Sequence, residues 1–173
     1  MSIKKMVLAA LFLALALYLP FLTGQIPQIG SMISPMHFPV LLAGFVCGPG
    51  YGLAVGFIAP LMRSFLFGMP PFPVVALPMA FELAAYGLLT GLFYKILPKR
   101  PGSIYGALLA AMVGGRIVWG LVRYAMLFTG TPFTWEIYIS SVIMGSLPGI
   151  ILQIVLIPLL VMALQRAGVM ENV

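Results

Sequence analysis

Five charged side chains of this 173-residue chain lie in or beside long apolar segments, where a charge is costly. A charged side chain at the centre of a bilayer costs at least about 2.5–3.5 kcal/mol, so it normally faces a partner or a water-filled cavity. A glutamate and an arginine can form a buried ion pair, and an arginine without a carboxylate partner can bind an anion. The set therefore predicts a polar site within an apolar protein. Its members are Arg63, Glu82, Arg116, Arg123 and Glu136.

Patterns for catalysis and metal binding are missing from the same sequence. The chain has one histidine, His37, one cysteine, Cys47, and no aspartate. Neither a disulfide within the chain nor a metal site built from several His or Cys ligands can therefore form. Neither the G-x-S-x-G nucleophile motif nor the H-E-x-x-H zinc motif occurs. We predict no enzyme activity, no catalytic residue, no metal site and no cofactor.

The composition predicts the elements that hold the polar site. Hydrophobic residues make up 62% of the chain and charged residues 7%, whereas soluble proteins carry about 25% charged residues. About 20 apolar residues cross a bilayer as a helix. We predict an all-α membrane protein, a single integral membrane domain over residues 1–173 with six transmembrane helices, at 3–22, 36–47, 51–67, 74–97, 103–128 and 136–165. The second is too short to span alone at about 1.5 Å per residue, so we expect it to be tilted, incomplete or extended.

The basic residues of the loops predict the orientation. They all lie in the first turn of the first helix, in the last turn of the fourth helix or just after it, or after the sixth helix. With six helices these segments share one side, and basic residues collect on the cytoplasmic side of membrane proteins. We therefore predict cytoplasmic N- and C-termini, and the net charge of +6 needs no nucleic-acid partner. The residues are Lys4, Lys5, Lys95, Lys99, Arg100 and Arg166.

Depth below the predicted outer surface brings the charged residues together. Glu82 lies roughly 13 Å from the outer end of its helix and Arg116 near the middle of the next, so we predict that they pair. Arg63 and Arg123 lie nearer the surface and are predicted to meet an anion. The arrangement predicts an outward-facing cavity lined by the third to sixth helices. The alternatives are a purely structural Glu82–Arg116 pair and arginines that reach outer phosphate groups.

Aromatic side chains that share a helix face with these charges are further candidates for ligand contacts. Trp119 lies between Arg116 and Arg123, which are seven residues apart and share a face. Tyr86 lies four residues after Glu82 and shares its face in the same way. We predict that Trp119 and Tyr86 stack on a ligand. The alternative is membership of an aromatic belt at the membrane surface.

The first loop, residues 23–36, is long for so compact a protein, and long loops often act as lids or binding loops. Gln28 lies in this loop and is predicted to help close the cavity. His37 follows at the outer start of the second helix, where it is either a ligand contact or an ordinary helix-end residue. Trp135 and Tyr138, at the outer start of the sixth helix, are assigned to the aromatic belt.

Pairs of glycines four residues apart are predicted to pack helices against one another. Because hydrophobic burial does little between helices in lipid, close backbone approach at small residues takes its place. The pairs are Gly52 and Gly56, Gly87 and Gly91, Gly102 and Gly106, and Gly145 and Gly149.

Four segments of the chain resemble one known family. They are HFPVLLAG at 37–44, GPGYGLAVG at 48–56, FELAAYG at 81–87 and GGRIVWG at 114–120. The chain resembles the substrate-binding (S) components of energy-coupling factor (ECF) vitamin transporters. The resemblance lies in these motifs, in their order along the chain and in the size of the chain. The resemblance implies a multi-pass protein of a bacterial-type cell membrane that binds a vitamin or vitamin precursor from outside. It also implies a scaffold membrane subunit, met by Ala10 and Ala14, and two cytoplasmic ATPases.

The charge balance of the predicted site favours one kind of ligand. Three arginines against one deep glutamate favour an anionic ligand, pantothenate- or folate-like, with aromatic side chains for its ring or apolar part. A neutral vitamin such as riboflavin or pyridoxine is the alternative, and it makes the arginines structural. Outside the family, the alternative is a stand-alone secondary carrier or channel. Such carriers usually have more intramembrane carboxylates than Glu82 alone.

Overall fold

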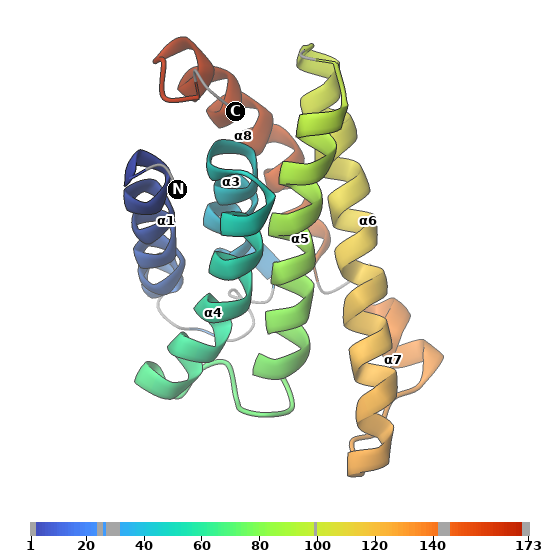
Figure 1. Ribbon diagram of the computed structural model, residues 1–173. Helices are drawn as coiled ribbons and strands as arrows, with labels where there is room; N and C mark the ends of the chain where they lie inside the picture. Colours follow the sequence, from blue (N-terminus) through green and yellow to red (C-terminus); the bar gives the residue numbers. More distant parts are fainter. Residues whose placement is uncertain (1–2, 24–25, 27–31, 99, 142–145, 171–173) are drawn as a thin grey trace.

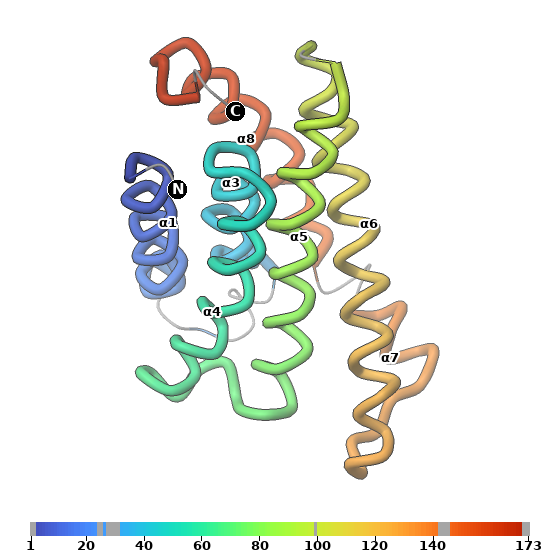
Figure 2. Tube along the Cα trace, in the orientation of Figure 1, coloured from blue at the N-terminus to red at the C-terminus, as the bar shows by residue number. Residues whose placement is uncertain are grey.

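The computed structural model describes residues 3–23, 26, 32–98, 100–141 and 146–170, and Gln28 lies outside them (Figure 1). The elements with assigned bounds are all helical. They are α1 (Ile3–Leu22), α3 (His37–Cys47), α4 (Pro49–Phe67), α5 (Ala76–Ile96), α6 (Pro101–Ala125), the 3-10 helix η1 (Met126–Thr129), α7 (Trp135–Ile139) and α8 (Leu147–Arg166). Figure 2 follows the same path as a tube. The predicted all-helical architecture is confirmed.

Five helical segments are long and apolar enough to cross a membrane. They are Ile3–Leu22, Pro49–Phe67, Ala76–Ile96, Pro101–Thr129 and Leu147–Arg166. α3 is a shorter apolar helix of 11 residues, and at about 1.5 Å per residue it is about 16 Å long. The structure therefore has five candidate spans and, in the described residues, one shorter apolar helix between the first two of them.

The predicted sixth helix, 136–165, is wrong as one continuous helix. α7 ends at Ile139, and α8 begins at Leu147 after a turn at Ser146. Pro148 lies in the first turn of α8. A proline has no backbone N–H to donate and its φ is already helical, so it favours the start of a helix over its interior. Apolar periodicity does not register this break, because the residues on both sides are equally hydrophobic.

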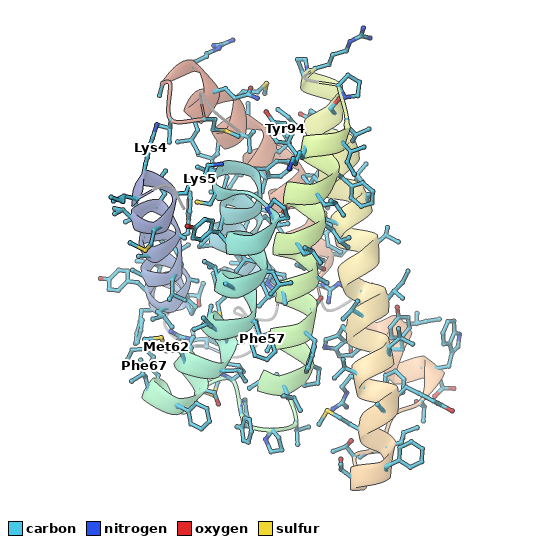
Figure 3. The ribbon with its side chains drawn as sticks, viewed as in Figure 1. Lys4, Lys5, Phe57, Met62, Phe67 and Tyr94 are labelled. Carbon is cyan, nitrogen blue, oxygen red and sulfur yellow. The ribbon has the colours of Figure 1, made fainter. Side chains whose placement is uncertain are left out.

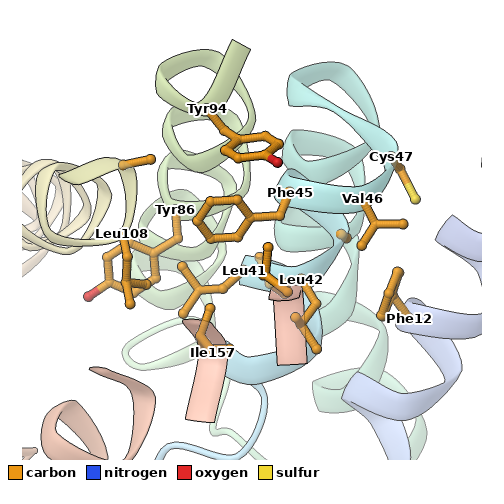
Figure 4. Packing of buried hydrophobic residues seen from close by; sticks show 14 of the residues in the cluster. Phe12, Leu41, Leu42, Phe45, Val46, Cys47, Tyr86, Tyr94, Leu108 and Ile157 are labelled. Carbon is orange, nitrogen blue, oxygen red and sulfur yellow. The ribbon is translucent and has the colours of Figure 1, made fainter. Parts of the chain in front are cut away.

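α3 lies at the centre of the bundle rather than against lipid. Ten of its 11 residues are buried. Phe45 packs edge-on against Tyr94 of α5, with 5.3 Å between ring centroids, and Figure 4 shows Phe45 beside Leu41 and Tyr86 in the buried cluster. A helix that faces protein on all sides need not match the thickness of the bilayer. This burial explains why a helix too short to span fits the fold.

Glycines bring α3, α4 and α5 into backbone contact. A Cβ added at Gly52 of α4 would lie 2.3 Å from the carbonyl oxygen of Gly87 of α5, and one added at Gly87 would lie 2.1 Å from that of Gly52. Likewise, an added Cβ at Gly56 would lie 2.2 Å from the Leu83 carbonyl oxygen, and one at Gly91 would lie 2.5 Å from the Pro49 nitrogen. The packing role predicted for the pairs at 52 and 56 and at 87 and 91 is confirmed.

The other two predicted glycine pairs behave differently. An added Cβ at Gly106 would reach only the side chain of Leu97, at 3.7 Å, and one at Gly102 would meet nothing described within 4 Å. The prediction that this pair packs helices is therefore wrong, since both residues lie on the exposed side of α6. A Cβ added at Gly149 would lie 2.6 Å from the carbonyl oxygen of Met32, so Gly149 does approach backbone. Gly145 lies outside the described residues.

The two ends of the bundle differ in their residues. Lys4 and Lys5 lie at the end that also carries the last turns of α8 and the connection from α5 to α6 (Figures 1 and 3). Met62 and Phe67 of α4 lie toward the opposite end (Figure 3). We call these the basic end and the distal end. The segments predicted to share one side of the membrane are thus together at the basic end.

Candidate substrate-binding site

The predicted pair between Glu82 and Arg116 is present in the structure. Glu82, on α5, is 3% exposed, and its Oε1 lies 2.9 Å from Nη1 of Arg116 on α6. Arg116 itself is only partly buried, with a side chain 17% exposed. Each charge offsets part of the cost of burying the other, and the pair ties the second turn of α5 to α6.

Glu82 also joins α3 to the site. The hydroxyl of Tyr86 donates a hydrogen bond to Glu82 Oε1 over 3.1 Å. Nε2 of His37, at the start of α3, lies 3.9 Å from the same oxygen. The His37 ring is buried against Tyr86, 5.3 Å between centroids, and neither of its nitrogens has a hydrogen-bond partner among the described residues. Of the sequence candidates, His37, Glu82, Tyr86 and Arg116 are thus brought together.

Arg116 links this cluster to α7 and α8. Its Nη2 donates to the hydroxyl of Ser146 over 2.7 Å, and Ser146 in turn donates to the Ser141 carbonyl over 3.1 Å. The Tyr138 hydroxyl donates to the backbone carbonyl of Arg116 over 3.3 Å. Sequence reasoning missed Ser146 and placed Tyr138 in a membrane belt. A signal for Ser146 is its position directly before the Leu-Pro-Gly helix start.

Gly115 makes room for the Tyr86 ring. A Cβ added at Gly115 would lie 2.1 Å from Cε1 and 2.2 Å from Cδ1 of Tyr86. The Tyr86 ring can therefore pack this closely on α6 only because this position has no side chain. Gly115 precedes Arg116 directly, so one short stretch of α6 both supports the ring and supplies the cation.

A cavity of about 460 Å³ opens beside this cluster. Its polar lining residues are Tyr86, Arg116 and Tyr138, and the other lining residues are aliphatic. Ligand pockets commonly have volumes of about 300–1,000 Å³ and mostly apolar walls with a few polar groups. The cavity is therefore large enough for a small organic molecule. Its full lining is Tyr86, Leu109, Met112, Val113, Arg116, Ile117, Tyr138, Leu147, Ile150 and Ile154.

Arg123 and Trp119 form an aromatic cluster with α7 and the segment before it. The Arg123 guanidinium carbon lies 5.9 Å from the Trp119 ring centroid and 6.0 Å from that of Phe133. Trp119 lies 6.0 Å from Tyr138, ring to ring. Nη1 of Arg123 donates to the Val74 carbonyl over 3.2 Å. Arg123 is thus held by aromatic faces and carbonyl oxygens, two turns of α6 away from Arg116.

Arg63 lies in another part of the molecule, between α4 and α1. Its Nη1 donates to the carbonyl of Leu17. Its guanidinium carbon lies 4.8 Å from the ring centroid of Phe21 and 5.4 Å from that of Phe67. The side chain is buried at 3% exposure. The structure thus gives Arg63 partners on α1 and α4, and none of its described contacts is with the Glu82 cluster.

Ala10 and Ala14 lie on the exposed face of α1. Both are exposed, as are Val7, Leu11 and Leu15 around them. The opposite face of α1 packs on α3 and α4 through Ala9, Phe12 and Ala16, which are buried. An exposed alanine stripe is therefore available on the outside of the bundle.

A comparison with protein families matches most of the chain. The family model described as "ECF transporter, substrate-specific component" matches residues 4–161. No curated protein and no solved structure matches the chain. The matched range runs from the first turn of α1 to the last third of α8, and so includes every residue of the site described above.

Proposed function

Since this chain belongs to the substrate-specific (S) components of ECF transporters, we propose that it binds a vitamin or vitamin precursor in the cavity beside Glu82 and Arg116. The observation that supports this site is the Glu82–Arg116 pair, 2.9 Å long, whose arginine lines a cavity of about 460 Å³. Buried charges inside membrane proteins commonly mark sites for substrates. The ligand would lie between α5, α6 and the start of α8, with α7 at the distal side.

We further propose the orientation in the membrane. The chain crosses the bilayer of a bacterial-type cell with α3 as a sixth, incomplete element, and the basic end faces the cytoplasm. The basic residues of the loops and termini support this orientation through the positive-inside rule. The cavity then lies toward the outside, where the substrate of an importer is captured.

The proposed partners are a scaffold membrane subunit and two cytoplasmic ATPases. The sequence has no G-x-x-x-x-G-K-[ST] phosphate loop, so the energy for release must come from other chains. The exposed stripe of Ala10 and Ala14 is the proposed contact with the scaffold, because small residues allow a second helix to approach closely. This stripe lies on the opposite side of α1 from the core, away from the cavity.

The charge of the ligand distinguishes two versions of the proposal. The anionic version, with a pantothenate- or folate-like ligand, now depends on Arg123, because Arg116 is paired with Glu82 and Arg63 is bonded to Leu17. The neutral version, with a vitamin such as riboflavin or pyridoxine, makes the arginines structural. A stand-alone carrier or channel remains the competing function outside this transporter class.

Co-purification tests the proposed function directly. The full chain is tagged in its native host, extracted in mild detergent, and analysed for partner subunits and bound small molecules by mass spectrometry. We expect a scaffold protein, two ATPases and one vitamin-sized solute. Ala10→Trp should remove the partner subunits but leave the solute, whereas Val155→Trp, on the exposed face of α8, should retain both. A wild-type chain that brings down neither partners nor solute would contradict the proposal.

A further inference from the structure

Glu82 lies between two side chains that can carry a positive charge, and it is bonded to only one of them. Nη1 of Arg116 lies 2.9 Å from Glu82 Oε1, whereas Nε2 of His37 lies 3.9 Å from the same oxygen. We propose that the ligand is a carboxylate-bearing anion that binds at Arg116 together with one proton, which His37 takes up. This inference rests on the proposed function and makes the affinity of the site depend on pH.

His37 is a buried side chain whose ring nitrogens are not satisfied. It is 4% exposed, and neither Nδ1 nor Nε2 has a hydrogen-bond partner among the described residues. Histidine is the side chain whose charge ordinarily changes between about pH 5 and pH 8. An imidazolium here would be attracted by Glu82 across 3.9 Å, in surroundings that hold little water to screen the charges. His37 is therefore placed to respond to the charge around Glu82.

The charges that act on His37 come from α5 and α6. α5 contributes Glu82 and Tyr86, whose ring centroid lies 5.3 Å from that of His37, and α6 contributes Arg116 behind Glu82. The stretch 24–36, directly before His37, has no titratable residue. α3 also packs on α1, α4 and α8. The titratable residues of these helices and of α3 itself make no described contact with His37, and they are Lys4, Lys5, Tyr18, Cys47, Tyr51, Arg63 and Arg166.

Charge balance links the proton to an anionic ligand. With a neutral imidazole, Glu82 and Arg116 cancel, and the cluster carries no net charge. A ligand carboxylate at Arg116 adds one negative charge, which is unfavourable beside mostly aliphatic walls. One proton on His37 restores neutrality, because the imidazolium then balances Glu82 and Arg116 balances the ligand. The coupling is reciprocal, so the anion favours the proton as much as the proton favours the anion.

Arg116 is the cation that the cavity presents to a ligand. It lines the cavity with a side chain that is 17% exposed, whereas Glu82 is not among the described lining residues. Nη2 of Arg116 donates to the Ser146 hydroxyl over 2.7 Å. A hydrogen bond to a carboxylate is roughly twice as strong as one to a neutral acceptor, so a ligand carboxylate can replace Ser146 at Nη2. The anionic version of the proposed function then no longer depends on Arg123.

A pair of matched probes tests the proposal. Pantothenate carries a carboxylate, and panthenol has an uncharged hydroxymethyl group in its place. The full-length protein, with an affinity tag that contains no histidine, is titrated calorimetrically with each probe from about pH 6 to about pH 8. The affinity for pantothenate should fall about tenfold for each pH unit over the range in which free His37 is neutral, because each complex then takes up one proton. The affinity for panthenol should not change with pH. Folate is the second anionic probe.

The protonation of His37 can be observed directly. His37 is the only histidine of the chain, so incorporation of ¹⁵N-labelled histidine gives the NMR signals of one imidazole. At about pH 8, we expect saturating pantothenate to change these signals from those of the neutral ring to those of the protonated ring. A ring that stays neutral in the pantothenate complex would overturn the proposal.

Two variants distinguish His37 from Glu82 as the group that takes up the proton. His37→Gln remains polar but cannot be protonated, so it should bind pantothenate at least about tenfold more weakly than wild type at about pH 6, and equally at every pH. Glu82→Gln leaves Arg116 without its carboxylate, so it should bind pantothenate without pH dependence and at least as tightly as wild type at about pH 8. A His37→Gln protein that keeps the wild-type pH dependence overturns the proposal, because another group then takes up the proton.

Thermal melting identifies a variant that does not fold, in which case the wild-type titration and the NMR signals decide. Co-purification keeps the proposed function separate. If the scaffold and ATPases co-purify with an uncharged solute, or if neither pantothenate nor folate binds at any pH to a chain that forms the complex, the proposal fails and the transport role stands. If no complex forms, no solute is retained and no probe binds, both fail.

Discussion

The helices α3, α4 and α5 meet backbone to backbone, whereas α6 and α8 meet through side chains around a cavity. In the first region, an added Cβ at Gly52 would lie 2.3 Å from the Gly87 carbonyl oxygen. In the second, the described polar link is the Arg116 to Ser146 bond, beside about 460 Å³ of open space. A backbone contact this close has one geometry, while contacts through side chains can change by rotamer. The comparison suggests a fixed frame, α3–α5, and an adaptable wall, α6–α8.

One ion pair connects these two regions. Glu82 belongs to the fixed frame and Arg116 to the adaptable wall. A ligand that moves α6 must therefore either stretch this ion pair or move α5 together with α6 through it. The following experiments change the frame, the pair and the wall in turn.

The largest effect is expected for a bulky side chain in the frame. Gly87→Leu places atoms where the Gly52 backbone lies, 2.1 Å from its oxygen, so α4 and α5 must separate. We expect destabilisation of at least about 5 kcal/mol and little folded protein. Gly106→Ala is the control, since its nearest neighbour is a Leu97 side-chain atom at 3.7 Å, and it should change stability by no more than about 1 kcal/mol. Size-exclusion chromatography and thermal melting compare the two, and equal stabilities would contradict the backbone contact.

Breaking the ion pair should have the next largest effect. Arg116→Ala leaves the Glu82 carboxylate buried without its cation, and removal of one partner of a buried pair typically costs about 3–5 kcal/mol. The double variant Glu82→Ala, Arg116→Ala should recover part of this loss, because no unpaired charge remains. Thermal melting of the wild type, the two single variants and the double variant gives the coupling free energy between Glu82 and Arg116. A double variant as unstable as the sum of the single variants would show that the two residues act independently.

Arg63→Ala should lower stability and leave ligand binding unchanged. The side chain bonds the Leu17 carbonyl and lies over Phe21 and Phe67, so its loss should destabilise α1 against α4 by about 2 kcal/mol. Melting curves and a binding isotherm of the same preparation separate the two effects. A loss of affinity without a loss of stability would show instead that Arg63 contacts the ligand.

Gly115→Ala should disturb the wall with less effect on the fold. The new methyl group would overlap the Tyr86 ring at 2.1 Å, and the ring must move away from α6. We expect about 1–3 kcal/mol of destabilisation together with weaker ligand binding. Gly114→Ala is the matched neighbour, because it meets only the tip of the flexible Leu89 side chain. If both variants bind alike, Tyr86 does not shape the site.

The smallest effect is expected at Arg123. Its guanidinium is held by aromatic rings and carbonyl oxygens at the distal end of α6, so Arg123→Ala should change affinity for an uncharged ligand by less than about 1 kcal/mol. An anionic ligand bound at Arg123 would instead lose about 2–5 kcal/mol. Isothermal titration with the co-purified solute distinguishes the two.

The sequence was sufficient to predict the pairing of Glu82 with Arg116. Each charge lies in an apolar helix at a similar depth, and no other arrangement removes both costs as simply. The bounds of α1 and the short α3 also followed from the sequence, because apolar runs and Gly-Pro breaks are local signals.

A local stretch of sequence does not show which helices will pack against each other. The predictions that depended on helix packing were therefore less successful. Arg63 has the same chemistry as Arg123, but its partners Leu17 and Phe21 come from α1, more than 40 residues earlier in the chain. Ser146 was missed because its role depends on how α8 begins next to α6. The glycine pairs that begin at 52 and 87 and the pair at 102 and 106 look alike in the sequence. Only the fold shows that the first two pairs are packed against backbone and that the last pair is exposed.

The burial of α3 has a consequence for how the protein is assembled in the membrane. A helix of 11 residues with ten of them covered by neighbours gains little from lipid alone, since it is too short to cross the hydrocarbon. α3 is joined to α4 only through Gly48, whose φ of 95° allows the tight turn. We therefore expect α3 to enter the bilayer together with α4 as a helical hairpin, and to stay loosely placed until α5 is synthesised. The order of synthesis then matches the order of packing, because α5 brings the glycines and the aromatic side chains that cover α3.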